Sequence, residues 1–150
     1  MIRIAVLAAA IAALGVAGTG TEAASRCAPT RADALGPFYE PGAPVRSKVG
    51  SGYVLSGRVL TVGCRPIARA RIEFWLVNPR GEYDDAHRAT VVAGRDGRYR
   101  FESNRPIAYE SRPAHIHVRV GVRGFRVLVT QHYPRPGRRA AVFNLVLARR

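Results

Sequence analysis

Short apolar segments separated by turn-forming residues occupy the chain from residue 53 onward. In the segment 70–77, Ile72, Phe74 and Leu76 alternate with residues that would face the opposite side, and this period of two is typical of a β-strand. The sequence RDG at 95–97 is a turn signal. In all, the pattern predicts at least six strands, at 53–60, 70–77, 97–103, 114–120, 125–131 and 141–147.

No amphipathic helical pattern separates these predicted strands. Parallel sheets need helical crossovers between their strands, so the pattern argues against an α/β fold. Closely spaced strands joined by turns are typical of an all-β, antiparallel two-sheet β-sandwich, and this is the fold that we predict. We expect its first two strands to form a hairpin. The preceding segment is rich in Pro, Gly and Ala, which predicts an extended arm over the surface of the domain.

The first residues of the chain have a different pattern. Arg3 is followed by an unbroken apolar run over 4–14 and then by small residues. This order is typical of a secretory signal peptide, and the run is shorter than the roughly 20 residues that span a bilayer. We predict a signal peptide over residues 1–24, cleaved after Ala23 or Ala24, and one β-sandwich domain over residues 25–150. The mature protein would be periplasmic or secreted, without a membrane span; an uncleaved N-terminal anchor is the alternative.

The predicted export bears on the cysteines. The chain has two, Cys27 and Cys64, and an oxidising compartment favours their pairing. We therefore predict a disulfide that ties the N-terminal arm to the first hairpin, with two free buried thiols as the alternative. Neither cysteine belongs to a CxxC motif, which argues against structural zinc and redox catalysis.

The net charge of +14 comes almost entirely from arginine. Such a surface attracts anions of every kind. The arginines are spread along the chain and no nucleic-acid-binding motif is recognised, so we do not expect a nucleic-acid partner. An aromatic carboxylate substrate or an acidic cell envelope is equally compatible with this charge, and an anion-binding envelope protein is one candidate function.

The sequence HIH at 115–117 is the first candidate for chemistry. On a strand, His115 and His117 point to the same face, with Cα atoms about 6.5–7 Å apart, and can bind one metal ion while the opposite face packs into the core. Two histidines are commonly joined by a carboxylate, and a zinc hydrolase of this type is one hypothesis. The acidic residues that could complete such a site are Glu82, Asp84, Asp85 and Glu110.

Tyr83 and Tyr109 offer a different set of ligands. The pKa of a phenol is about 10, so tyrosine binds as phenolate at neutral pH only to a strongly Lewis-acidic ion. Iron(III) is such an ion, whereas zinc and calcium deprotonate phenol poorly. Two phenolates and two neutral histidines would leave one positive charge on iron(III), and a bound hydroxide could complete the coordination.

Five segments together resemble the intradiol ring-cleavage dioxygenases, the family of protocatechuate 3,4-dioxygenase and catechol 1,2-dioxygenase. The most specific is RPAHIHVRV at 112–120, which is similar to the histidine signature of the family. The others are GPFYEPGAPVR (36–46), IARARIEFWLVNPRGEY (67–83), DGRYRFES (96–103) and LVTQHY (128–133). The resemblance implies the β-sandwich of this family and cleavage of a catechol-type diol by dioxygen at a mononuclear non-haem iron(III) site, giving a muconate-type product.

The resemblance also implies roles for individual residues. The positions that match the iron ligands are Tyr83, Tyr109, His115 and His117. Tyr109 matches the axial tyrosine that leaves when catechol binds, Arg112 an arginine that stabilises charge on the substrate, and Gln131 a glutamine beside the iron. In the GPFY motif, we predict that Pro37 and Tyr39 contact the substrate together with Arg112.

Two differences separate the chain from large members of the family. Only two residues lie between Tyr109 and Arg112, where those enzymes have a longer insertion; small exported members are similar to this chain in that respect. No counterpart of the helical N-terminal domain of catechol 1,2-dioxygenases is recognised, so their mode of dimerisation is not implied and no oligomeric state is predicted. A non-catalytic, transthyretin-like binding module that retains the metal site is the alternative function.

Overall fold

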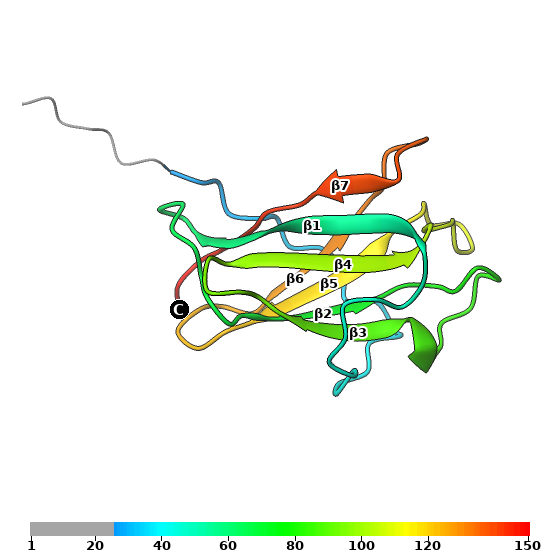
Figure 1. Ribbon diagram of the computed structural model, residues 1–150, viewed down its shortest axis with the longest axis horizontal. Helices are drawn as coiled ribbons and strands as arrows, with labels where there is room; N and C mark the ends of the chain where they lie inside the picture. The colour runs from blue at the N-terminus through cyan, green and yellow to red at the C-terminus, as the bar shows by residue number, and fades with distance from the viewer. Residues whose placement is uncertain (1–25) are drawn as a thin grey trace, which may run out of the picture.

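The computed structural model describes residues 26–150, and the predicted signal peptide lies outside them. Within this range the chain forms two stacked sheets and a short 3-10 helix, η1 (Asp85–His87), which confirms the predicted β-sandwich (Figure 1). The strands are β1 (Gly52–Thr61), β2 (Arg71–Trp75), β3 (Arg88–Val92), β4 (Arg98–Asn104), β5 (Ile116–Gly121), β6 (Leu128–His132), β7 (Ala140–Val142) and β8 (Leu145–Leu147). No helix among these residues is long and apolar enough to cross a membrane.

The strands and their pairing differ from the prediction in three respects. The β1 sheet has the order β4-β1-β7, with β8 also paired to β1, and the β2 sheet has the order β3-β2-β5-β6. The expected hairpin of β1 with β2 is therefore wrong, because the two strands belong to different sheets. The predicted strand at 141–147 is divided into β7 and β8, which both run parallel to β1. Strand β3 is absent from the prediction.

The core lies between the two sheets. Phe74 of β2 stacks on Phe101 of β4, with ring centroids 4.3 Å apart. Ile72 and Val118 are fully buried on the same face of the β2 sheet. Burial of each such side chain contributes about 1.5–3 kcal/mol, so this apolar layer is the main source of stability.

The arm crosses the outer face of the β2 sheet, which turns away from this core. Its path is fixed by buried side chains of the sheet: Gln131, Arg88 and Thr90 donate hydrogen bonds of 2.7, 2.6 and 2.8 Å to main-chain carbonyls of the arm. The arm therefore satisfies polar groups of the outer face that it also shields from water.

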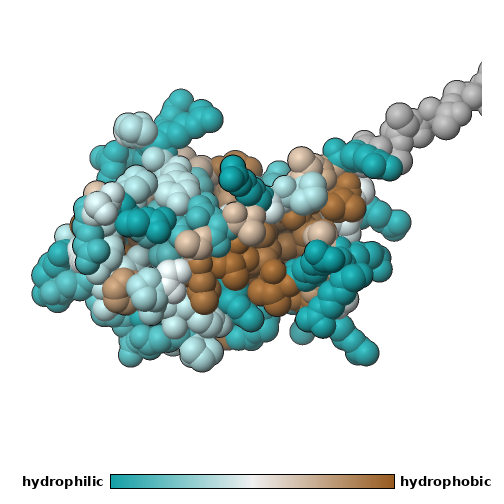
Figure 2. All heavy atoms as spheres, turned by 180° about the vertical axis from the view of Figure 1, so that it is seen from behind, coloured by the Kyte–Doolittle hydropathy of each residue, from teal (hydrophilic) through white to brown (hydrophobic). Residues whose placement is uncertain are grey.

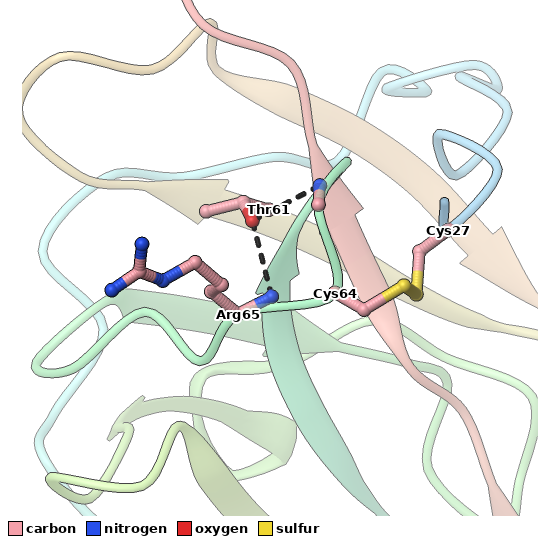
Figure 3. Close-up of a disulfide and its surroundings, with 5 residues drawn as sticks. Cys27, Thr61, Cys64 and Arg65 are labelled. Atoms are coloured by element: carbon pink, nitrogen blue, oxygen red, sulfur yellow. Dashed lines mark hydrogen bonds between the residues drawn. A yellow bond between two sulfur atoms is a disulfide. The ribbon is translucent and has the colours of Figure 1, made fainter. Parts of the chain in front are cut away.

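A disulfide fixes the start of the arm beside the end of β1. Cys27 and Cys64 are joined, with Cα atoms 5.2 Å apart, and the pairing is the predicted one. Thr61 Oγ1 accepts hydrogen bonds of 3.2 Å from the main-chain N–H groups of Gly63 and Arg65. Figure 3 shows how this turn directs Cys64 toward Cys27 while the Arg65 side chain points away from the disulfide.

Candidate metal centre

As the alternation in HIH predicts, the two histidines and the residues between and after them point to opposite faces of the β2 sheet. Ile116 and Val118 point into the core and are fully buried. His115 and His117 point to the outer face, where the arm covers them and leaves only 4% and 3% of their surface exposed. Both imidazoles are thus held in a site that is shielded from solvent.

Three donor atoms converge on this face. Tyr83, on the loop between β2 and η1, places its Oη 3.2 Å from His115 Nε2 and 3.0 Å from His117 Nε2. The two Nε2 atoms are 3.1 Å apart. The atoms form a nearly equilateral triangle, although Tyr83 is more than thirty residues away in the sequence.

Hydrogen bonding sets the tautomer of His115. Its Nδ1 lies 2.6 Å from the carbonyl oxygen of Pro113, which can only accept a hydrogen bond. We therefore assign the proton to Nδ1. The lone pair of Nε2 then faces Tyr83 and His117, and this is the arrangement of a metal-binding imidazole.

Packing fixes the ring of His117. The ring stacks on Trp75, with centroids 4.8 Å apart and planes within 4°. Gly36 of the arm approaches the ring from outside with φ +75°, and a Cβ at this position would lie 3.0 Å from His117 Cε1. Burial lowers the pKa of His117 to about 3, with further lowering by His115 and Arg112, so the imidazole is neutral at physiological pH.

Tyr83 is held in an aromatic cluster. Phe38 of the arm stacks on it at 4.4 Å, and Tyr109 packs edge-on with its ring centroid 5.4 Å away. Burial raises the pKa of Tyr83 to about 12, and Tyr109 adds to this effect. Without a cation the hydroxyl stays protonated, so only a strongly Lewis-acidic ion would convert it to phenolate.

A tight turn joins Tyr109 to Arg112. The main-chain N–H and C=O groups of the two residues exchange hydrogen bonds of 3.1 and 2.9 Å, and Glu110 takes a left-handed conformation with φ +49°. The two-residue spacing therefore brings both residues to the same rim. A hydrogen bond to Glu110 raises the pKa of the Tyr109 hydroxyl.

Arg112 is oriented by a network that reaches the arm. Its Nη2 donates to Gln131 Oε1 at 2.7 Å and to Tyr133 Oη at 3.2 Å. Tyr133 in turn donates to Asp33 Oδ2 at 2.9 Å. No functional role is predicted for Tyr133 from the sequence. Its place in LVTQHY, two residues after Gln131 and directly after the end of β6, is the signal that could have identified it.

These side chains surround a cavity of about 300 Å³. The lining residues are Gly36, Pro37, Phe38, Tyr83, Tyr109, Glu110, Arg112, His115 and His117. Pro37, a predicted substrate contact, is one of these lining residues. Tyr39 does not line the cavity, and Phe38 contributes the aromatic wall from this motif.

Tyr39 belongs instead to a partly buried polar cluster between the arm and β2. Its hydroxyl lies 3.2 and 3.3 Å from the carboxylate oxygens of Glu73, which also pairs with Arg119 at 2.5 Å. The Tyr39 ring packs on Trp75, with centroids 5.1 Å apart. The cluster therefore supports Trp75, the residue on which His117 stacks.

The geometry fits a single metal ion bound by nitrogen and phenolate ligands. Two ligand atoms about 2.1 Å from one ion and at right angles are roughly 3 Å apart. The triangle of Tyr83 Oη, His115 Nε2 and His117 Nε2 has edges of this length. Residues 26–150 contain no group of three or more His, Cys, Asp or Glu side chains placed to hold a metal, so the carboxylate-based zinc hypothesis gains no support there.

Similar sequences are found among curated proteins, although no protein-family model matches the chain. Hydroxyquinol 1,2-dioxygenase of Rhizobium sp. strain MTP-10005 is 31% identical over 131 residues, covering 64% of this chain and 44% of that protein. Catechol 1,2-dioxygenase of Candida albicans is 29% identical over 136 residues, covering 66% and 45%. The chain spans about half the length of these curated relatives.

Solved structures with the same fold are also similar. The dioxygenase domain of a dioxygenase–carbohydrate-binding fusion from Streptomyces sp. SirexAA-E gives a TM-score of 0.73 at 26% identity, covering 80% of this chain and 98% of that domain. Hydroxyquinol 1,2-dioxygenase from Pseudomonas putida DLL-E4 gives 0.74 at 19% identity, covering 81% and 67%. At 19% identity, the similarity to the Pseudomonas putida structure shows only that the fold is shared.

Proposed function

We propose that the chain is an intradiol ring-cleavage dioxygenase, as its similarity to curated 1,2-dioxygenases and to a solved dioxygenase domain supports. It would cleave a catechol-type aromatic diol with dioxygen, between the two hydroxyl-bearing carbons, to a muconate-type diacid. The cofactor would be one non-haem iron(III) ion held by Tyr83, Tyr109, His115 and His117. The observation that supports this most strongly is the convergence of the Tyr83 hydroxyl and both Nε2 atoms within 3.0–3.2 Å of one another in the cavity.

The donor set suits this ion. Both imidazoles can bind in the neutral form, and two phenolates would offset most of the charge of a trivalent cation. When bound, iron(III) would supply Lewis acidity toward the oxygens of the diol. A divalent ion would ionise the buried Tyr83 less readily, because burial raises the pKa of this hydroxyl to about 12.

The cavity supplies binding and charge stabilisation. Pro37 and Phe38 form an apolar wall against which an aromatic ring can pack. The Arg112 guanidinium stays protonated and cannot act as a base, so its role would be to stabilise negative charge on a substrate oxygen. Gln131 and Tyr133 hold it in place through the two hydrogen bonds to its Nη2.

Tyr109 is the group placed to exchange protons with the substrate. It lines the cavity at the turn that leads to Arg112, next to Glu110. As a phenolate it would accept a proton from the diol at Oη, and the raised pKa of this hydroxyl favours the protonated form afterwards. Tyr83, which is more deeply buried, would stay in place.

We also propose that the protein acts outside the cytoplasm. The N-terminal sequence supports export, and the Cys27–Cys64 disulfide is of the kind that persists in oxidising compartments. The substrate would then be a catechol encountered in the periplasm or the medium.

Oxygen consumption tests the proposed activity. The iron-loaded protein is mixed with catechol, protocatechuate or hydroxyquinol, and oxygen uptake is followed with an electrode while the product is identified by mass. We expect one dioxygen consumed per ring opened, with both oxygen atoms in the diacid. Arg112→Gln should keep its iron and lower kcat by about 10²-fold. Diol binding without oxygen uptake on any substrate would favour the non-catalytic binding module.

A further inference from the structure

Positive charge gathers at the end of the sandwich that lies farthest from the candidate metal centre. This basic end comprises the turns 62–70, 93–97 and 122–127 and the C-terminal residues 148–150. Strand register brings these segments together, because Arg71 pairs with both Val92 and Gly121, and Phe125 bridges to Arg149. Figure 1 shows the C-terminus at this end, on the left.

Charge is unevenly divided between the two ends. Nine exposed arginines lie in the segments of the basic end or at the strand residues beside them: Arg65, Arg69, Arg71, Arg95, Arg98, Arg123, Arg126, Arg149 and Arg150. The one acidic residue there, Asp96, pairs with Arg98 at 2.9 Å. Six acidic residues lie instead on the arm and loops of the opposite end: Asp33, Glu40, Glu82, Asp84, Asp85 and Glu110.

Apolar side chains are exposed between these arginines. The valines at this end with more than two fifths of their surface exposed are Val62, Val92 and Val127. A groove of about 700 Å³ is lined by Phe125, Arg65 and Arg149 among other residues, and the Arg149 guanidinium lies 5.5 Å from the centroid of the Phe125 ring. Figure 2 shows brown apolar residues beside teal hydrophilic side chains toward this end, on the right.

We propose that the basic end docks on the surface of an anionic phospholipid membrane. Clustered arginines match lipid phosphates, and exposed valines with a partly apolar groove match the boundary of the acyl chains. A soluble polyanion would bind the arginines but would not contact the exposed apolar residues.

The course of the chain supports the same orientation. The apolar run over residues 4–14 is followed by the segment that enters the domain at Cys27. Cys27 is bonded to Cys64, the residue before Arg65, so the apolar sequence is attached at the basic end (Figure 3). During export, or in the alternative in which residues 1–24 stay uncleaved, the basic end would therefore be the part of the domain nearest the membrane. The candidate metal centre would open toward the aqueous side, and the inference is independent of the proposed function.

Vesicle sedimentation tests the proposal with matched charge variants. The probes are vesicles of equal parts phosphatidylcholine and phosphatidylglycerol, and vesicles of phosphatidylcholine alone. One variant combines Arg65→Glu, Arg95→Glu and Arg123→Glu at the basic end. Its control combines Arg105→Glu, Arg135→Glu and Arg138→Glu, three exposed arginines at the opposite end. All proteins begin at residue 25, the predicted mature N-terminus, so the apolar run over residues 4–14 cannot bind the vesicles, and circular dichroism confirms that each is folded.

We expect the parent protein to bind anionic vesicles with an affinity that falls as salt rises. The basic-end variant should bind at least about tenfold more weakly, and the control less than about threefold more weakly. Equal losses in the two variants, or equal binding to neutral vesicles, would overturn the assignment of this surface. Tighter binding to soluble polygalacturonate than to anionic vesicles would overturn the membrane as the partner.

Discussion

The two faces of the β2 sheet are buried to a similar degree but by different means. On the inner face, Ile72 and Phe74 are fully buried against apolar side chains of the β1 sheet. On the outer face, Glu73, Trp75 and His117 are 7%, 2% and 3% exposed, beneath an arm with no strand of its own. Polar groups buried in this way usually need hydrogen-bond partners. Tyr39 of the arm supplies one to Glu73, whereas Trp75 Nε1 and His117 Nδ1 have no partner among the described residues.

The two faces therefore have different roles: the inner face stabilises the fold, and the outer face holds the candidate metal ligands. Apolar contacts on the inner face hold the sandwich together whatever the outer face contains. Side chains on the outer face are rigid because neighbouring rings and the arm confine them, and they keep the polar atoms that can bind a metal. Substitutions on the two faces should therefore have different consequences.

The largest expected effect on folding is on the inner face. Phe74→Ala should lower the free energy of unfolding by about 3–5 kcal/mol, because it leaves a cavity against Phe101. Denaturant titration measures this loss, and Val62→Ala, at an exposed position, should change the value by less than about 0.5 kcal/mol. The folded fraction should still bind iron. If both substitutions had equally small effects, the inner face would not be the source of stability.

The next effect is on the outer face, at Gly36. Gly36→Ala adds a Cβ 3.0 Å from His117 Cε1 and should weaken iron binding by about 10–100-fold, measured by competition with a chelator. Gly124→Ala is the matched control, since Gly124 has a similar φ of +87° but no atom within 4 Å of the added Cβ. Both substitutions should cost about 1–2 kcal/mol of stability from backbone strain. Equal iron affinity in the two variants would refute the role of Gly36 in holding the ring.

A smaller effect is expected at Glu73, beneath the arm. Glu73→Gln keeps the shape of the side chain and a hydrogen bond to Tyr39, but removes the charge that pairs with Arg119. We expect a loss of about 1 kcal/mol in the free energy of unfolding and a small shift in iron affinity through Trp75. Glu102→Gln, in an exposed pair with Lys48, should change less. A larger loss of stability in Glu102→Gln than in Glu73→Gln would mean that the polar cluster around Glu73 does not hold the arm in place.

A pH dependence is also expected at the edge of the inner face. Burial lowers the pKa of His132 from 6.5 to about 4, while the unfolded chain keeps the ordinary value. Between these values the unfolded state binds more protons, so stability should fall as the pH falls from about 6.5 to about 4. Thermal unfolding measures this as a decrease in Tm that is smaller in His132→Gln. Identical pH profiles for the two proteins would assign the acid sensitivity to other groups.

The sequence predicted those features that depend on local pattern. Alternation identified the sandwich and placed both histidines of HIH on one face, away from Ile116 and Val118. Strand β3 was missed because Arg88 and Thr90 look like solvent-facing residues; they are buried only because the arm accepts their hydrogen bonds. These hydrogen bonds join segments more than forty residues apart, so the local alternation of polar and apolar residues cannot predict them.

The candidate site was predicted unevenly for the same reason. Tyr83 and Tyr109 lie on loops, where no periodicity identifies a ligand. The chemistry of phenolate made them candidates, and only the family resemblance assigned them as ligands. The resemblance also suggested Tyr39 as a substrate contact. In the structure its hydroxyl bonds to Glu73, and it is Phe38 that lines the cavity. The direction of a side chain on an irregular arm depends on what the arm packs against, and the sequence does not encode this locally.

Metal content and the visible spectrum of protein purified in air test directly whether the chain binds iron(III) through Tyr83 and His117. We expect about one iron per chain and a broad visible band from phenolate bound to iron(III). His117→Ala should lose iron and with it the band. Tyr83→Phe should either lose iron or keep a weaker, shifted band from Tyr109 alone, while His87→Ala, outside the cluster, should keep the band unchanged. A colourless protein that holds zinc, or an unchanged band in both Tyr83→Phe and His117→Ala, would contradict the assignment of these residues as iron(III) ligands.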